Sequence, residues 1–443
     1  MTEFVPALLV ALVGLAFASL QASKYPRPEA RLLRASFAAH VVSALGQVWM
    51  MRGFYGYGDL LNYATHGEIL AAALRADFSQ FAPEVLKILF HTPGVVPTEI
   101  PGMGSSTASM AALAGILSFV TGGAAYTLCI AVGIMAYFGQ VALYRAFRSA
   151  FGAEHRRSLL IAALLIPSEV FWSSALLKEA VAMAAFGYLI LGLERTFLRE
   201  VRPGGILMIT LGAVAVSLFK AYILLATVAA LGAGIYYRTK GRRSKVSRPA
   251  QFIWAVTVAA TCYFGLTRAM PEYSIENFAE RAATMQELGQ EYAGGSTYSM
   301  GDPTSRTLVG QLAFAPIALG SSVFRPLLVE ARNPLIFVNA LETSAVLYLF
   351  VRVLRRRGVR KTWAVLTGNA VLMFCFAFVI VFGTGVGLTT TNMGTLSRYR
   401  VPLVPFLWVL LLVLDAKEPR TATQPVVTRV ARRPARVGLP RRA

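Results

Sequence analysis

The chain has 443 residues, of which 56% are hydrophobic and only 15% carry a charge. Soluble proteins carry about a quarter charged residues, so this composition excludes an ordinary soluble domain and indicates that lipid surrounds much of the protein. The 43 Lys and Arg against 22 Asp and Glu give a net charge of +21. In a soluble protein this excess suggests nucleic-acid binding, but in a membrane protein basic residues concentrate in cytoplasmic loops.

Apolar runs suited to crossing about 30 Å of hydrocarbon recur along the chain. We therefore expect an all-α polytopic membrane protein with about eleven transmembrane helices, joined by re-entrant or interfacial outer helices. The predicted spans are Phe4–Leu20, Ser36–Met51, Ala124–Ala146, Leu159–Leu177, Ala180–Phe197, Gly205–Phe219, Ala221–Tyr237, Phe252–Leu266, Pro334–Val353, Thr362–Phe382 and Val401–Leu414. The first run follows Glu3 and lacks a clear cleavage site, so it is predicted to be a retained helix, not a signal peptide.

Basic clusters predict the orientation of these spans, because Lys and Arg favour cytoplasmic loops. The clusters are Lys24–Arg34, Arg145–Arg157, Arg195–Arg202, Arg238–Arg248, Arg352–Lys361 and Lys417–Arg442. All of them lie on one side if the chain starts outside, crosses eleven times and ends in the cytoplasm. Two further apolar stretches, Met110–Val120 and Leu308–Val323, must then be re-entrant or lie along the membrane surface.

This topology predicts the domain organisation. Residues 1–415 form a single transmembrane helical domain with outer loops at 52–109 and 267–307, and residues 416–443 form a basic, disordered cytoplasmic tail. The outer loops are expected to contain an amphipathic stretch, Leu60–Leu74, and a helix around Ile275–Glu291. The three cysteines show no pairing or ligand spacing, so neither disulfides nor a metal site is indicated.

The first outer loop places Asp59 at the start of a predicted helix, directly after an aromatic stretch. One interpretation is a helix N-cap, where the dipole favours a carboxylate. The other is a general base at the membrane surface, with Tyr57 and Tyr55 forming a platform for sugar stacking. His66 has no metal-ligand spacing.

Two polar features lie at the predicted outer ends of the middle spans. The turn Pro167–Ala180 contains Glu169 and Lys178 beside Trp172, which favours a polar cavity but also fits an ordinary hairpin. Lys220 is the charge inside the long apolar hairpin Gly205–Tyr237, where it either acts in a site or extends toward the interface.

A third feature precedes the last span, in the segment TTTNMGTLSRYRVPL. Arg398 and Arg400 are predicted to lie outside, on the side where arginines are disfavoured, together with Asn392. Arg binds phosphate in a bidentate manner, so these residues predict contact with an anionic partner. Anchoring to lipid headgroups is the alternative interpretation.

These motifs together resemble bacterial polytopic proteins of cell-surface polysaccharide assembly. The resemblance rests on the outer-loop Gly-Asp near aromatic residues, the PSxxFWSSxxxKE turn and the NxGTxxRxRxP segment. It includes GT-C-type glycosyltransferases and oligosaccharide repeat-unit polymerases of the Wzy kind. The former would make Asp59 the base, and the latter would make Arg398 and Arg400 contacts to pyrophosphate. The paired acids of many GT-C enzymes are absent, because Leu60 and Leu61 follow Asp59.

The resemblance implies a multi-pass protein of the bacterial inner (plasma) membrane. It implies glycosyl transfer or polymerisation at the extracytoplasmic face, with a polyprenyl-phosphate-linked sugar as donor. Asp59 or Glu169 would be catalytic, and Lys178, Lys220, Arg398, Arg400, Tyr57 and Asn392 would bind phosphate or substrate. We expect no cofactor, although a divalent metal is compatible.

The expected partners are the lipid-linked saccharide, membrane lipids and other polysaccharide-assembly proteins, but not nucleic acid. A transporter or flippase of a lipid-linked saccharide is the alternative, because it needs the same cations but no base. A structural partner of a secretion complex is a third.

Overall fold

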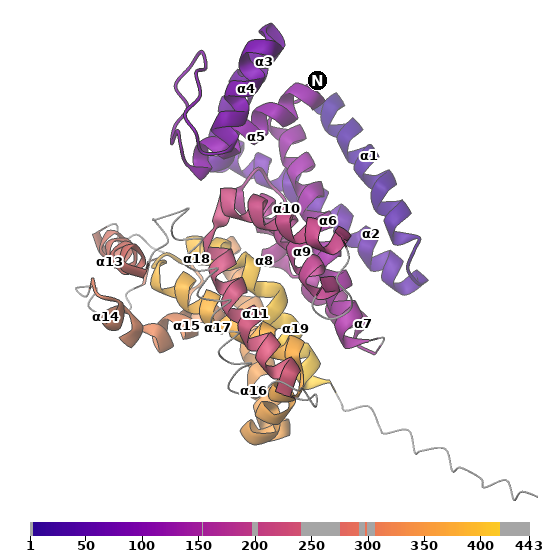
Figure 1. Ribbon diagram of the computed structural model, residues 1–443, viewed down its shortest axis with the longest axis vertical. Helices are drawn as coiled ribbons and strands as arrows, with labels where there is room; N and C mark the ends of the chain where they lie inside the picture. The colour runs from indigo at the N-terminus through magenta and orange to yellow at the C-terminus, as the bar shows by residue number, and fades with distance from the viewer. Residues whose placement is uncertain are drawn as a thin grey trace, which may run out of the picture.

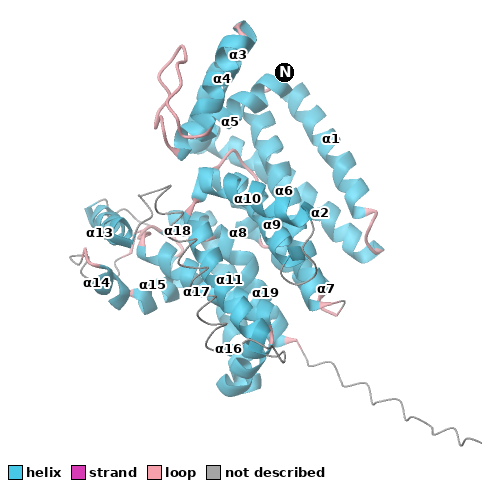
Figure 2. Ribbon diagram, in the orientation of Figure 1, coloured by secondary structure: helices cyan, strands magenta, loops and turns pink. Residues whose placement is uncertain are grey.

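The computed structural model describes residues 3–152, 154–196, 203–240, 275–291, 297–298 and 306–416. Helices make up most of these ranges, and Figure 2 shows no strand among them. Within the same ranges, an isolated antiparallel bridge joins Thr297 to Asn392. The expected all-α fold class is therefore confirmed.

The first half of the chain contributes the helices around the N-terminus and the upper part of the bundle in Figure 1. They are α1 (Phe4–Ala22), α2 (Arg27–Met50), the π-helical turn η1 (Met51–Tyr55), α3 (Asp59–Ala76), α4 (Phe78–Leu89), α5 (Ser106–Thr121), α6 (Ala125–Phe151), α7 (Arg156–Leu164), α8 (Pro167–Trp172) and α9 (Lys178–Glu194). Helices α3, α4 and α5 gather at one end of the molecule, and α16 lies at the other (Figure 1).

The second half packs against α5, α7, α8 and α9. Its elements are α10 (Pro203–Lys220), α11 (Tyr222–Lys240), α13 (Ile275–Glu291), α14 (Leu308–Ala313), α15 (Ala315–Phe324), η4 (Leu328–Glu330), α16 (Pro334–Gly368), α17 (Ala370–Leu388), α18 (Met393–Tyr399), η5 (Val401–Leu403) and α19 (Val404–Asp415). Helix α16 is interrupted at Gly358, whose φ of 71° is left-handed.

Five helices in the described ranges are long and apolar enough to cross a membrane, and they are compatible with a membrane protein. They are α1, α6, α10, α16 and α17. A sixth span results if α18 and the segment Val401–Asp415, which bend by 47° at their junction, cross together. The eleven predicted spans are therefore not confirmed, and one of them, Phe252–Leu266, lies outside the described residues.

Breaks within apolar runs explain much of the difference. The predicted span Leu159–Leu177 is divided into α7 and α8, because Pro167 at the start of α8 has no backbone N–H to continue α7. Likewise, Thr362–Phe382 is divided at Asn369, whose side chain caps α17 by accepting from the N–H groups of Val371 and Leu372.

The predicted outer segments are largely helical. The helix at Ile275–Glu291 is confirmed as α13. Met110–Val120 lies within α5, which packs on α3 so closely that a Cβ on Gly67 would come within 2.5 Å of Ala114. Leu308–Val323 forms the two short helices α14 and α15. Residues 417–443, which include nearly all of the predicted tail, lie outside the described ranges.

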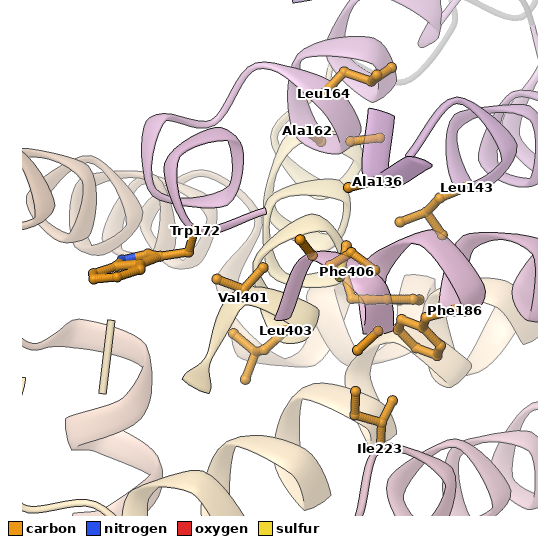
Figure 3. Close-up of a cluster of buried hydrophobic side chains, with 14 of the residues drawn as sticks. Ala136, Leu143, Ala162, Leu164, Trp172, Phe186, Ile223, Val401, Leu403 and Phe406 are labelled. Atoms are coloured by element: carbon orange, nitrogen blue, oxygen red, sulfur yellow. The ribbon is translucent and has the colours of Figure 1, made fainter. Parts of the chain in front are cut away.

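The core is formed where α6 and α9 cross. A Cβ built on Gly187 would lie 1.8 Å from the carbonyl oxygen of Gly139, so only glycine allows the two backbones to approach this closely. Beside this crossing, Phe406 packs with Phe378 at a ring-centroid distance of 4.6 Å and with Phe186 at 5.6 Å. Figure 3 shows Phe186 and Phe406 within this apolar cluster, which fixes α9 against α19.

Candidate functional site

Five charged side chains from four helices meet near the N-terminus of α3. They are Asp59 of α3, Lys178 and Glu179 of α9, Lys220 of α10 and Arg398 of α18, and we call them the charged cluster. Four of them, all except Glu179, are residues that the sequence singled out as candidates. The structure therefore brings together side chains that lie as many as 339 positions apart in the sequence.

Glu179 lies at the centre of the charged cluster. Its side chain is fully buried, and its Oε1 lies 2.7 Å from Lys220 Nζ and 2.9 Å from Arg398 Nε. Glu179 is in the first turn of α9, where the helix dipole favours a negative charge. The two cations therefore share one buried counter-ion. Glu179 Oε1 and Arg398 Nε lie at ion-pair distance without hydrogen-bond alignment, and Glu179 Oε2 has no hydrogen-bond partner among the described residues, so these atoms still have hydrogen-bonding capacity.

Arg398 connects this buried acid to a more exposed one. Its Nη1 donates to Asp59 Oδ2 at 2.8 Å, while its Nε faces Glu179. The Asp59 side chain is 49% exposed, in contrast to 20% for Arg398. Asp59 is also in the first turn of α3, but the structure shows no side-chain cap at the N-terminus of this helix. The arginine, not a capping hydrogen bond, therefore holds this carboxylate.

Lys220 ends α10 in a closely packed aromatic environment. Its Nζ donates to the Tyr222 hydroxyl at 2.9 Å and lies 4.3 Å from the centre of the Tyr399 ring. The cation–π contact adds to the ion pair with Glu179. Because Lys220 is only 5% exposed, it does not extend into solvent in the manner of an interfacial lysine.

Lys178 approaches the cluster from the side of α5. Its Nζ donates to Ser106 Oγ and Thr107 Oγ1, each at 2.9 Å. Burial, and then the nearby Lys220 charge, lower the pKa of Lys178. Tyr63 also faces this region, and burial followed by the Asp59 charge raises the pKa of its phenol. Tyr63 therefore stays neutral and can serve as a hydrogen-bond donor.

The charges of the cluster do not cancel. Its three cations, Lys178, Lys220 and Arg398, face the two carboxylates of Asp59 and Glu179, so the net charge favours an anion. Within the part of the chain that the structure describes, no group of three or more His, Cys, Asp and Glu side chains has the arrangement of a metal site. Phosphate fits this set of cations better than a metal ion does.

Glu169 and Arg400 lie in a separate polar region. Glu169 is completely buried, and neither of its carboxylate oxygens has a hydrogen-bond partner in the part of the chain that the structure describes. The adjacent Ser168 donates both its N–H and its hydroxyl to Glu342 of α16. Arg400 is 2% exposed, and its Nη1 donates to the carbonyl oxygen of Arg325 at 2.6 Å. Neither Glu169 nor Arg400 has an ion pair with the charged cluster.

The two remaining candidates lie at the edges of the site. Asn392 is the N-cap of α18, and its side chain accepts from the N–H groups of Gly394 and Thr395. It therefore helps to position the helix that carries Arg398. Tyr57 is 76% exposed, so its ring is open to solvent two residues before Asp59.

The sequence placed Glu179 in the polar turn Pro167–Ala180 but gave it no role in the site. The neighbouring Lys178 could be predicted because cations are disfavoured on the extracytoplasmic side of the membrane, whereas acids are common on that side. A Lys-Glu pair at the start of an apolar helix was the available signal. The roles of Ser106, Thr107 and Tyr399 depend on distant helices, so no local pattern predicts them.

No protein-family model, curated protein or solved structure matches this chain. The charged cluster and its position in the bundle are therefore the basis for assigning a function.

Proposed function

We propose that the protein is a membrane glycosyltransferase or polysaccharide polymerase that acts at the extracytoplasmic face on a polyprenyl-phosphate-linked sugar. The observation that carries the proposal is the convergence of Lys178, Lys220 and Arg398 around Glu179. The charged cluster lies at the start of α9, whereas basic residues such as Arg195 follow the other end of this helix. By the positive-inside rule, the cluster end is the outer one.

The cations would neutralise the phosphate of the lipid donor. Two unit charges about 4 Å apart attract each other by about 4 kcal/mol at the effective dielectric constant near a protein surface. Three cations at this distance would offset much of the cost of removing a phosphate from water. Arg398 and Lys220 are held by ion pairs to Glu179, so they are positioned before the donor binds.

Asp59 would be the general base. Its Oδ2 is paired with Arg398, and its half-exposed side chain leaves the other oxygen accessible. In the proposed reaction, Asp59 takes the proton of the acceptor hydroxyl as the acceptor oxygen bonds to the anomeric carbon. The bond between that carbon and the phosphate oxygen breaks, and the lipid phosphate leaves with its negative charge near the cations. Glu169 is a weaker candidate, because it is completely buried.

The test is glycosyl transfer in vesicles that contain the purified protein and a synthetic polyprenyl-phosphate sugar. Asp59→Asn should lower the transfer rate by about 10²- to 10⁴-fold, the range for loss of a general base, while binding of the lipid donor is retained. Asp77→Asn is a matched control, because Asp77 is an acid of the same outer segment whose carboxylate accepts from the Gln80 N–H and the Ser79 hydroxyl at the start of α4. It should transfer at the normal rate.

A carrier for the same lipid would give a different result. Asp59→Asn would then move a fluorescent lipid-linked saccharide between leaflets at the rate of the unmodified protein, and neither protein would form a glycosidic product. That outcome would replace the transferase with a transporter or flippase.

A further inference from the structure

An apolar cavity lies far from the charged cluster, between α6, α9, α11, α17 and α19. Ile190 and Glu194 of α9 line it, more than ten residues beyond Glu179. At 1.5 Å per residue, the cavity is roughly 20 Å from the cluster along α9. It is therefore independent of the proposed transfer site.

The lining of this cavity is almost entirely apolar. Phe147 and Phe406 form part of the wall, with their rings 5.4 Å apart in an edge-on arrangement, and Phe374 lies 6.0 Å from Phe406. Leu231 of α11 also contributes to the lining. A cavity bounded by aromatic and aliphatic side chains between membrane helices suits a hydrocarbon chain.

Two charged residues also line the cavity, and they differ in their partners. Glu194 accepts a hydrogen bond from the Ser149 hydroxyl. For the Arg238 guanidinium, in contrast, no hydrogen bond or ion pair occurs with any other described residue. Arg238 also begins a basic cluster that the sequence places in the cytoplasm. A cation without a counter-ion in the described ranges, beside an apolar cavity, is complementary to a lipid with an anionic headgroup.

We infer that this cavity binds one hydrocarbon chain of an anionic phospholipid of the inner leaflet, whose phosphate contacts Arg238. The apolar wall receives the chain, and Arg238 selects the headgroup. The lipid-linked donor is not the occupant, because its phosphate belongs at the opposite end of α9. Since α9 carries Glu179 at one end and the cavity at the other, the bound lipid also supports the helix that positions the charged cluster.

The test uses the unmodified full-length protein in vesicles doped with phosphatidylglycerol that carries a photoreactive group at the end of one acyl chain. Peptide mapping after illumination should show labelling around Phe147, Ile190 and Phe374. Phosphatidylcholine with the same chain should label these positions about fivefold less, since a basic residue near the membrane surface contributes about that factor of affinity for an anionic lipid. Leu207 of α10 is 57% exposed and should be labelled equally by both lipids.

Two variants complete the test. Arg238→Gln should remove the preference for phosphatidylglycerol, and Arg238→Lys should keep it. Equal labelling of the cavity by both lipids in the unmodified protein would overturn the inference, as would the absence of lipid label there. Helix content measured by circular dichroism should be the same in both variants, so a lost preference cannot come from unfolding.

Discussion

Arg398 holds two carboxylates at once, with Nη1 2.8 Å from Asp59 Oδ2 and Nε 2.9 Å from Glu179 Oε1. One carboxylate is half exposed and the other is completely buried. A phosphate that approaches from the open side therefore competes with Asp59 for the guanidinium, not with Glu179. Donor binding would release Asp59 Oδ2 from its partner, which would leave both oxygens of the carboxylate free to accept a proton.

The exposed pair should contribute little to stability. An ion pair open to solvent is worth about 1 kcal/mol or less. Asp59→Asn is therefore expected to lower the free energy of unfolding by no more than that amount, while glycosyl transfer falls by about two orders of magnitude or more. Denaturant titration and transfer assays on the same preparation measure both. A hundredfold loss of rate corresponds to about 2.7 kcal/mol. A fall of that size in the free energy of unfolding would make Asp59 a structural residue.

The buried pair should behave in the opposite way. Glu179→Gln leaves Lys220 and Arg398 without their shared counter-ion, so we expect a loss of about 3–5 kcal/mol in the free energy of unfolding. The double variant Glu179→Gln/Lys220→Gln should lose less than the sum of the two single variants, because the residues are in direct contact. Additive losses in this double-mutant cycle would contradict the coupling.

The lowered pKa of Lys178 predicts a pH dependence of donor binding. Burial is the main cause of the shift, followed by the charge of Lys220. As the pH rises, Lys178 loses its proton earlier than an exposed lysine does, so affinity for a lipid phosphate should fall in the alkaline range. The Lys178→Arg variant stays charged, so its affinity for the lipid phosphate should not fall in the alkaline range. Binding titrations of both proteins across this range provide the measurement, and an identical decline would exclude Lys178 as the cause.

The crossing of α6 and α9 should not tolerate a side chain. Gly187→Ala would place a methyl group against the Gly139 carbonyl oxygen, where the available distance is 1.8 Å. We expect α6 and α9 to move apart and the melting temperature to fall markedly. Gly204→Ala is the control, because a Cβ there would meet no atom within 4 Å. Similar melting temperatures for the two variants would show that α6 and α9 do not cross as described.

The predicted orientation can be tested at described positions. Single cysteines at Asn392 and Asp59 should react with a membrane-impermeant reagent added outside intact cells, and a cysteine at Arg356 should react only after the membrane is opened. Sequence places Asp302 outside, and Arg242 and Arg433 in the cytoplasm, although these three lie beyond the described residues. Equal labelling at Asn392 and Arg356 in a cysteine-free background would refute this topology.

The charged cluster was partly predictable because its cations lie where cations are disfavoured. Three cations could be identified from the apolar or outer sequence around them, without any knowledge of distant neighbours: Lys178, Lys220 and Arg398. The direction in which a side chain points was not predictable in the same way. Glu169 and Lys178 belong to one polar turn, yet Glu169 is fully buried and Lys178 reaches α5. That difference depends on how α8 and α9 are packed.

The number of spans was harder to predict than the helical class. Apolar runs show where a helix can be buried, but they do not show whether it continues across the bilayer. Pro167 and Asn369 each end one helix and start another inside a run that appeared continuous. In α2, polar residues such as Glu29 and His40 are buried against other helices, so low hydropathy there does not mean exposure to water.

Helix α18 separates the two polar regions. Arg398 and Arg400 are two positions apart, which corresponds to about 200° around a helix, and they contact Asp59 and the Arg325 carbonyl oxygen, respectively. A turn of this short segment about its axis would withdraw one arginine and displace the other in the same movement. A movement of this segment at the charged cluster would therefore also change the contact with the Arg325 carbonyl oxygen.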